Sequence, residues 1–189
     1  MMRNGKQRFT ASVEYNEKTI QKVFRVEYFT YDRIKIIARA CIGFALIAMT
    51  VFLELSTLFV VACLAVGCWL IVCIDFPSKV KAEGVLQARN GAVTTVNLQF
   101  GENAVKVVEG KQSYKYSAID RLVTDGDYLF LFCDRQTAVM LDRRTLEPAD
   151  ERAFKQFIEE KTGKKWKGTS LLLMNFQDLR QAMKDRKKQ

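Results

Sequence analysis

Apolar residues dominate the stretch from residue 40 to residue 74, and this stretch predicts two membrane-crossing helices. It holds two apolar runs, Ala40–Leu53 and Leu55–Ile74, which only Glu54 separates. The second run has twenty residues and no charge, enough at about 1.5 Å per residue to cross a hydrocarbon core of roughly 30 Å. One helix through both runs would place a carboxylate at mid-membrane, where a charge is costly. The pattern therefore favours a helical hairpin that turns at Glu54.

The first run is too short to span a bilayer unless its helix begins at Ile34. That extension includes Lys35 and Arg39, whose long side chains can reach the headgroup layer from a position near the helix end. We therefore expect spans at residues 34–53 and 55–74.

Small residues recur in both predicted spans, Gly43 and Gly67 among them. Small side chains let membrane helices approach closely. Packing within the hairpin is favoured over a dimer interface at Cys63-x-x-x-Gly67.

The flanking charges predict the orientation of the hairpin. Basic residues next to spans favour the cytoplasmic side, and the turn at residues 54–57 has none. Both termini should therefore be cytoplasmic in a multi-pass membrane protein. The flanking basic residues are Lys22, Arg25, Arg33, Lys35, Arg39, Lys79, Lys81 and Arg89.

The residues before the hairpin predict a strand and a helix. Apolar and polar side chains alternate over Phe9–Tyr15, as in a half-buried strand. Asn16 is suited to cap a helix that follows. This helix ends in Tyr28, Phe29 and Tyr31, which could lie at the membrane interface or pack on the protein.

The second half of the chain predicts an antiparallel β domain. Residues 78–90 are ambiguous between helix and strand, and Asn90-Gly91 is a strong turn signal. Five strands follow, separated by turns rich in Gly and Asp. Tyr128–Cys133 is apolar on both faces and should be a central, covered strand, and Phe9–Tyr15 could join the same sheet. The expected strands are 94–100, 105–107, 114–123, 128–133 and 137–141.

A final amphipathic helix should cover this domain. Pro148 suits a first helical turn, the acidic residues 150–151 favour a helix N-terminus, residues 153–158 carry an apolar stripe, and Gly163 suits the end. We therefore predict an α+β membrane protein: a two-helix transmembrane hairpin with a pleckstrin-homology-like (PH-like) antiparallel β domain closed by a C-terminal helix. The expected parts are residues 1–33, 34–76, 77–163 and 164–189.

The charge of the chain is concentrated at its C-terminal end. The formal net charge is +9, and residues 161–189 carry +7 of it. Leu171–Phe176 beside these cations could form a membrane-surface helix or pack on the domain. Anionic inner-leaflet lipid is the expected partner, and tethering to a membrane disfavours nucleic acid. The candidate lipid contacts are Lys164, Lys165, Lys167, Arg180, Lys184, Arg186, Lys187 and Lys188.

The sequence offers little for catalysis. It has no histidine, which removes the usual zinc ligand and the usual general base. Nucleotide-binding, zinc-protease and serine-hydrolase motifs are missing, and four of the five cysteines lie in the apolar runs. We expect no enzyme activity, no metal and no cofactor. Arg135, Arg143 and Arg144 could form a phosphate-binding corner, although solvated turn arginines are the favoured alternative.

The order of these elements resembles the YcxB-like family of small bacterial membrane proteins. The resemblance covers about residues 8–162 and implies an architecture, since the family brings no catalytic residues to carry over. The chain departs from it at Tyr116, where the family often has tryptophan, and at Asp142, where it often has proline. Both departures put only packing and turn geometry in doubt. The matching segments are Phe9–Tyr15, Tyr114–Leu122, Asp127–Phe132, Thr137–Leu141 and Glu151–Ile158.

Two functions fit these predictions. The first is a non-enzymatic anchored module that presents the PH-like domain to lipids or proteins at the inner leaflet. The second is a regulatory or assembly subunit whose hairpin pairs with a transporter, a sensor or another copy of itself.

Overall fold

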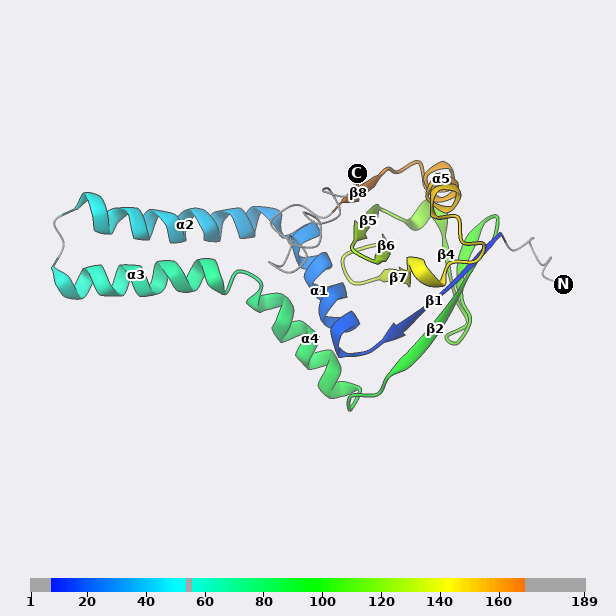
Figure 1. Cartoon of the computed structure of the whole chain (residues 1–189), viewed down its shortest axis with the longest axis horizontal. Helices are drawn as coiled ribbons and strands as arrows, with labels where there is room; N and C mark the ends of the chain where they lie inside the picture. Colours follow the sequence, from blue (N-terminus) through cyan, green and yellow to red (C-terminus); the bar gives the residue numbers. More distant parts are fainter. Residues whose placement is uncertain (1–7, 54–55, 169–189) are drawn as a thin grey trace, which may run out of the picture. The chain divides into compact units, whose positions relative to one another are not determined.

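The computed structural model describes residues 8–53 and 56–168 and divides into two compact units (Figure 1). The β unit comprises Met1–Thr19 and Ala92–Gln189, and the helical unit comprises Ile20–Gly91. The helical unit is therefore inserted between two strands of the β unit.

The first sheet of the β unit has the order β1-β2-β3-β4, and each neighbouring pair is antiparallel. β1 pairs with β2 along its whole length, ending with Tyr15 opposite Thr94. The N-terminal strand thus joins the sheet, as its alternation suggested. The strands are β1 (Phe9–Tyr15), β2 (Thr94–Phe100), β3 (Ala104–Val107) and β4 (Gln112–Lys115).

The second sheet has the order β7-β6-β5-β8, in which β8 is parallel to β5 and the other pairs are antiparallel. β6 is an inner strand and almost entirely buried, which confirms the prediction for Tyr128–Cys133. The five strands predicted after Gly91 do not lie in one sheet, because the structure divides the strands between two sheets. These strands are β5 (Arg121–Asp125), β6 (Tyr128–Phe132), β7 (Ala138–Asp142) and β8 (Trp166–Gly168).

The predicted strand 114–123 is also wrong, because a short 3-10 helix, η1 (Tyr116–Ala118), interrupts it and the chain passes there from one sheet to the other. Tyr116 is buried, and its hydroxyl donates a hydrogen bond of 2.8 Å to the Gly101 carbonyl. This buried and hydrogen-bonded side chain anchors the chain at the point where it leaves the first sheet.

Helix α5 (Glu151–Thr162) covers the core of the β unit, as its apolar stripe predicted. Asp150 caps it by accepting a bond from Ala153 N–H, and Gly163 ends it with φ +66°. Pro148 lies before the helix and not in its first turn, which corrects that prediction. The ring of Phe154 makes edge-on contacts with Phe9 of β1 and Phe100 of β2.

The chain enters the helical unit through α1 (Glu17–Tyr31), followed by α2 (Arg33–Phe52), α3 (Thr57–Val72) and α4 (Phe76–Ala88). The predicted cap is confirmed, since Thr19 N–H donates to Asn16 Oδ1 at 3.1 Å. Tyr28 and Phe29 are buried at the end of α1. These two aromatic side chains therefore pack inside the protein and do not face a membrane interface.

Helices α2 and α3 run antiparallel in close contact through two glycines (Figure 1). A methyl group on Gly43 would meet the Gly67 carbonyl oxygen at 3.0 Å, and one on Gly67 would meet the Gly43 carbonyl at 2.9 Å. These small residues thus serve packing within the hairpin, which confirms the favoured interpretation.

The ambiguous segment 78–90 is mostly helical. Pro77 lies in the first turn of α4, where its missing N–H costs nothing. The axis of α4 is bent by 55° from that of α3. The predicted turn after it is confirmed, because Asn90 and Gly91 both have positive φ.

Candidate functional site

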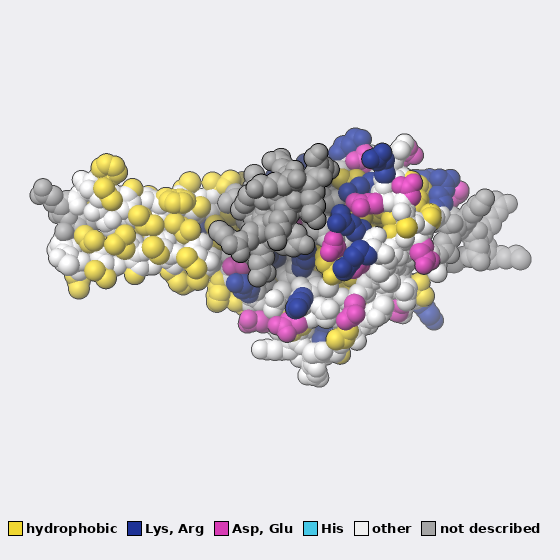
Figure 2. Space-filling view, in the orientation of Figure 1, with side chains coloured by type: hydrophobic (Ala, Val, Ile, Leu, Met, Phe, Trp, Pro, Cys, Tyr) yellow, Lys and Arg dark blue, Asp and Glu magenta, His cyan; other side chains and the backbone are white. Residues whose placement is uncertain are grey.

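Large apolar side chains are exposed on the outside of α2 and α3. Figure 2 shows hydrophobic side chains over this pair. Only 11% of the 18-residue apolar stretch within α2 is buried. The core helix of a water-soluble protein, by contrast, buries its apolar face. Exposed side chains on both helices include Phe44, Val51, Phe52, Leu58, Phe59 and Trp69.

The helices differ in their length relative to a bilayer. Among the described residues, α2 alone is long and apolar enough to cross a membrane, which matches the expected first span. α3 has 16 residues. It is long and apolar enough to cross a membrane only if α4 continues the same span beyond the bend between them. The predicted second span, 55–74, is thus longer than the helix found there. At 1.5 Å per residue α3 is about 24 Å long.

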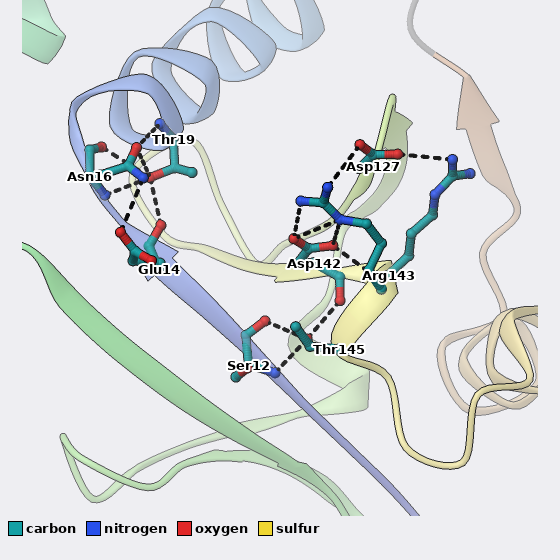
Figure 3. A network of polar contacts seen from close by, with 9 residues as sticks. Ser12, Glu14, Asn16, Thr19, Asp127, Asp142, Arg143 and Thr145 are labelled. Atoms are coloured by element: carbon teal, nitrogen blue, oxygen red, sulfur yellow. Dashed lines mark hydrogen bonds and ion pairs between the residues drawn. The ribbon is translucent and has the colours of Figure 1, made fainter.

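A network of carboxylates and guanidinium groups surrounds the end of β7 (Figure 3). Arg144 makes a two-pronged contact with Asp142, whose shortest distance is 2.6 Å, and lies 3.6 Å from Asp127. Arg143 pairs with Asp127 at 3.0 Å and with Glu151 at 3.7 Å. Both arginines therefore already have carboxylate partners, which opposes their use as phosphate contacts.

The carboxyl of Asp142 is electrostatically tied to these arginines. Burial by itself would raise its pKa, but the hydrogen bonds from Arg144 and the charges of Arg144 and Arg143 outweigh burial and lower the pKa. Asp142 thus remains a carboxylate at neutral pH and holds the turn after β7 in place.

The turn after β7 also holds the edge of β1 that does not pair with β2. The Thr145 hydroxyl accepts a bond of 2.9 Å from Ser12 N–H and lies 2.7 Å from the Ser12 carbonyl oxygen (Figure 3). Thr10 and Glu147 exchange two backbone hydrogen bonds of 2.7 and 2.8 Å. The arginine network therefore fixes the contact between the two sheets, and its evident role is structural.

The three arginines of the predicted phosphate-binding corner lie on both sides of β7 in the chain. Arg135 precedes β7, whereas Arg143 and Arg144 follow it, so the five residues of the strand separate them. At about 3.3 Å per residue the two ends of the strand are too far apart to hold one phosphate group.

The basic segment after α5 begins as an ordered strand. The indole N–H of Trp166 donates to the Lys155 carbonyl at 3.1 Å, and its backbone N–H donates to Glu159. Lys165 pairs with Glu159 at 2.7 Å, and this contact lowers the pKa of Glu159. A tryptophan just after a glycine helix stop was the signal that could have revealed β8.

The remaining candidate lipid contacts fall into two groups. Lys164 and Lys167 are exposed, on either side of Trp166. The apolar run 171–176 and five of the basic residues lie outside the described residues; the five are Arg180, Lys184, Arg186, Lys187 and Lys188.

No metal-ligand cluster stands out in the described part of the chain. Residues 8–53 and 56–168 contain no group of three His, Cys, Asp or Glu side chains suited to hold an ion. Cys41 and Cys68 are exposed on the hairpin, and all five cysteines are free.

Comparison with known proteins places part of the β unit in a family. The family model described as YcxB-like protein matches residues 100–158, from the last residue of β2 into α5. No curated protein and no solved structure matches the chain. The matched residues include η1, the inner strand β6 and the arginine network after β7. The resemblance to the YcxB-like family is thereby confirmed over residues 100–158, and the family model does not reach the earlier part of the resemblance, residues 8–99.

Proposed function

We propose that this protein is a non-enzymatic module anchored in the bacterial cell membrane. In this proposal α2 and α3 cross the bilayer as a hairpin, both termini are cytoplasmic, and the β unit works at the inner leaflet. The observation that carries it is the orientation of side chains on the two helices: glycines face inward, and large apolar side chains face outward.

The energetics favour lipid around this pair. Moving a large apolar side chain out of water contributes about 1.5–3 kcal/mol, and the outward faces of both helices carry several. Lys35 and Arg39 lie in the first two turns of α2, where their charged groups can reach the headgroups. The Arg39 guanidinium also donates to the Tyr28 hydroxyl at 2.9 Å, so it is not left unpaired.

We include a PH-like role for the β unit in the proposal. Its support is the order of elements, with a four-stranded antiparallel sheet first, then three antiparallel strands, then one helix over the core. Domains of this layout are interaction modules, and an analogy of layout alone makes this part a hypothesis. Lipid or a cytoplasmic protein is the proposed partner.

Within this proposal the C-terminal basic segment contacts anionic lipid. Lys164, Lys165 and Lys167 are its exposed members among the described residues, and Lys165 is paired with Glu159. Each basic residue near an anionic leaflet contributes about 1 kcal/mol, decreasing with salt. Arg143 and Arg144 are left out because carboxylates already hold them.

Two measurements on the full chain test the anchor and its orientation. The protein should stay in the membrane fraction after alkaline carbonate extraction, and reporters fused to either terminus should both indicate the cytoplasm. Release by carbonate, or termini on opposite sides, contradicts the hairpin.

A truncation tests the basic segment. In liposomes, a chain that ends at Gly168 should contact phosphatidylglycerol less than the full chain, and the difference should vanish at high salt. Equal contact in phosphatidylglycerol and phosphatidylcholine would contradict the lipid role of the segment while leaving the anchor intact.

The alternative function, an assembly subunit, has one observation in its favour. Cys41, Ala45 and Ala48 are exposed on α2, and small outward residues suit contact with a further membrane helix. With the other cysteines replaced by alanine, Cys41 cross-linking in native membranes should yield one defined product if a partner helix lies there. A diffuse pattern or no product would favour a surface that faces lipid.

A further inference from the structure

Helix α4 presents two different faces. Ser78 and Ala82, four residues apart and thus on one side of the helix, are buried. Phe76 and Val80, also four residues apart, are exposed. A short helix with a packed face and a second, exposed apolar stripe needs another apolar surface for that stripe.

An ion pair fixes which face of α4 points inward. Lys81 Nζ lies 3.0 Å from Oε1 of Glu27 on α1, and this carboxylate is buried. Breaking this contact would cost a buried carboxylate one of its charged contacts. Rotation of α4 about its axis to hide Phe76 and Val80 is therefore costly, and the exposed stripe is a stable feature of the helical unit.

The charges of α4 argue against a continuation of the span. Lys79, Lys81 and Glu83 lie within five residues, and a Lys or Asp at a bilayer centre costs about 2.5–3.5 kcal/mol. The 55° bend directs α4 away from the axis of α3. A helix with an apolar stripe flanked by lysines is suited to the boundary between headgroups and acyl chains.

The neighbouring residues of the helical unit complete such a boundary. Because α2 and α3 are antiparallel, the first turn of α2 and the last turn of α3 lie at the same end of the pair (Figure 1). Ile34 is 84% exposed, between the exposed side chains of Arg33 and Lys35. Apolar side chains beside cations, at the end where α4 begins, fit lipid tails and lipid phosphates together.

We infer that α4 is an interfacial helix whose Phe76–Val80 stripe inserts at the boundary between phospholipid headgroups and acyl chains. The exposed side chain of Arg33 lies at the level of the phosphates. Lys35 and Lys79 lie there too: each makes one contact with a carboxylate on its own helix turn, Asp32 at 3.0 Å and Asp75 at 3.3 Å, and each ammonium group has further N–H groups for a phosphate. This inference rests on the proposed function, because it takes the outside of α2 and α3 to be in lipid. Besides the hairpin and the C-terminal basic segment, α4 would be a third part of the chain in contact with lipid. This contact would set the depth of the hairpin in the bilayer.

The test compares three valines of similar exposure in the full chain. Val61 on α3, Val80 on α4 and Val108 in the turn after β3 are 61%, 49% and 45% exposed. Each is changed singly to cysteine and spin-labelled in a protein reconstituted into nanodiscs of phosphatidylcholine and phosphatidylglycerol. The native cysteines are first replaced by alanine; they are Cys41, Cys63, Cys68, Cys73 and Cys133.

Collision of each label with oxygen, which concentrates in lipid, and with a water-soluble nickel complex then measures its depth. We expect oxygen to dominate at V61C and V80C, with V80C shallower, and nickel to dominate at V108C. Nickel dominance at V80C with V61C in lipid would overturn the interfacial helix and leave the anchor standing. Nickel dominance at both would overturn both proposals. Access by neither reagent at V80C would mean that protein covers the stripe, which also overturns the inference.

Discussion

The two units of this chain use apolar side chains in opposite ways. In the β unit, Phe154 is fully buried against the aromatic rings of two strands. In the helical unit, Phe44 is exposed on a helix whose glycine neighbour, Gly43, is buried. Water drives large residues inward, while in lipid that drive vanishes and close packing of small residues holds helices together. Each unit therefore fits one solvent, and the contrast supports a membrane around only one of them.

Separation of the two units is the most drastic test of this contrast. Tyr15 and Thr94 are direct partners in the β1–β2 ladder, so the two ends of the inserted segment lie side by side. Replacement of residues 16–93 by Asn-Gly, which favours a tight hairpin turn, should move the protein from the membrane fraction to the soluble fraction. The β unit should stay folded, as shown by a cooperative thermal transition.

The control for this excision is a fragment of residues 76–189, which lacks β1. It should not show a cooperative transition, because β1 pairs with β2 on one edge and with Thr145 and Glu147 on the other. A folded fragment 76–189 would contradict the need of the β unit for β1. An excised protein still held in membranes would contradict the helical unit as the membrane anchor.

The second test replaces one phenylalanine by alanine in each unit and compares the losses of stability. Phe154→Ala should lower the free energy of unfolding of the β unit by about 3–5 kcal/mol, the usual cost of a large core cavity. Phe44→Ala should change it by less than about 0.5 kcal/mol, because that ring lies on the surface of the other unit. Trp166 fluorescence in a Trp69→Phe background reports the transition in detergent. Equal losses for the two variants would show that the units do not differ in this way.

The sequence predicted the parts of this contrast that depend on local patterns. Period-two alternation identified β1, and the apolar stripe identified α5 with its Asp150 cap and Gly163 stop. Features set by distant contacts were missed. The break at Tyr116 depends on Gly101, fifteen residues away, and β8 forms because Trp166 finds Lys155 and Glu159 on α5.

The candidate site shows the same limit. Residue types alone suggested that Arg143 and Arg144 were available to phosphate, but their carboxylate partners include Asp127, fifteen or more positions earlier in the chain. Arg135 seemed close to them in sequence, yet a whole strand lies between. Charge pairing across strands is not visible in a list of basic residues, whereas the exposure of α2 followed directly from its composition.

A third test sharpens the role of the glycines in the helical unit. Gly43→Val should separate α2 and α3, because even one added carbon would meet the Gly67 carbonyl at 3.0 Å; overpacking of this kind costs about 1–3 kcal/mol. Gly84→Ala on α4 is the matched control, since it has open space around it and should gain about 0.5–1 kcal/mol of helix propensity. With the native cysteines replaced by alanine, spin labels at the exposed positions Phe44 on α2 and Trp69 on α3 can report the separation of the two helices. An unchanged separation in Gly43→Val would contradict a packed glycine contact.

The smallest expected effect concerns the carboxylate network of the β unit. The pKa of Asp142 is lowered in the folded state, so the ionised carboxylate stabilises the fold above its unfolded pKa of about 3.9, and this contribution is lost as the pH falls below about 4. Asp142→Asn should lower the thermal midpoint of the β unit at pH 7 and should weaken its decline between pH 5 and pH 3. Arg144→Gln should do the same through the same contact, and the two changes together should cost less than their sum. Additive losses, or an unchanged acid profile in Asp142→Asn, would show that the pair does not hold the turn after β7.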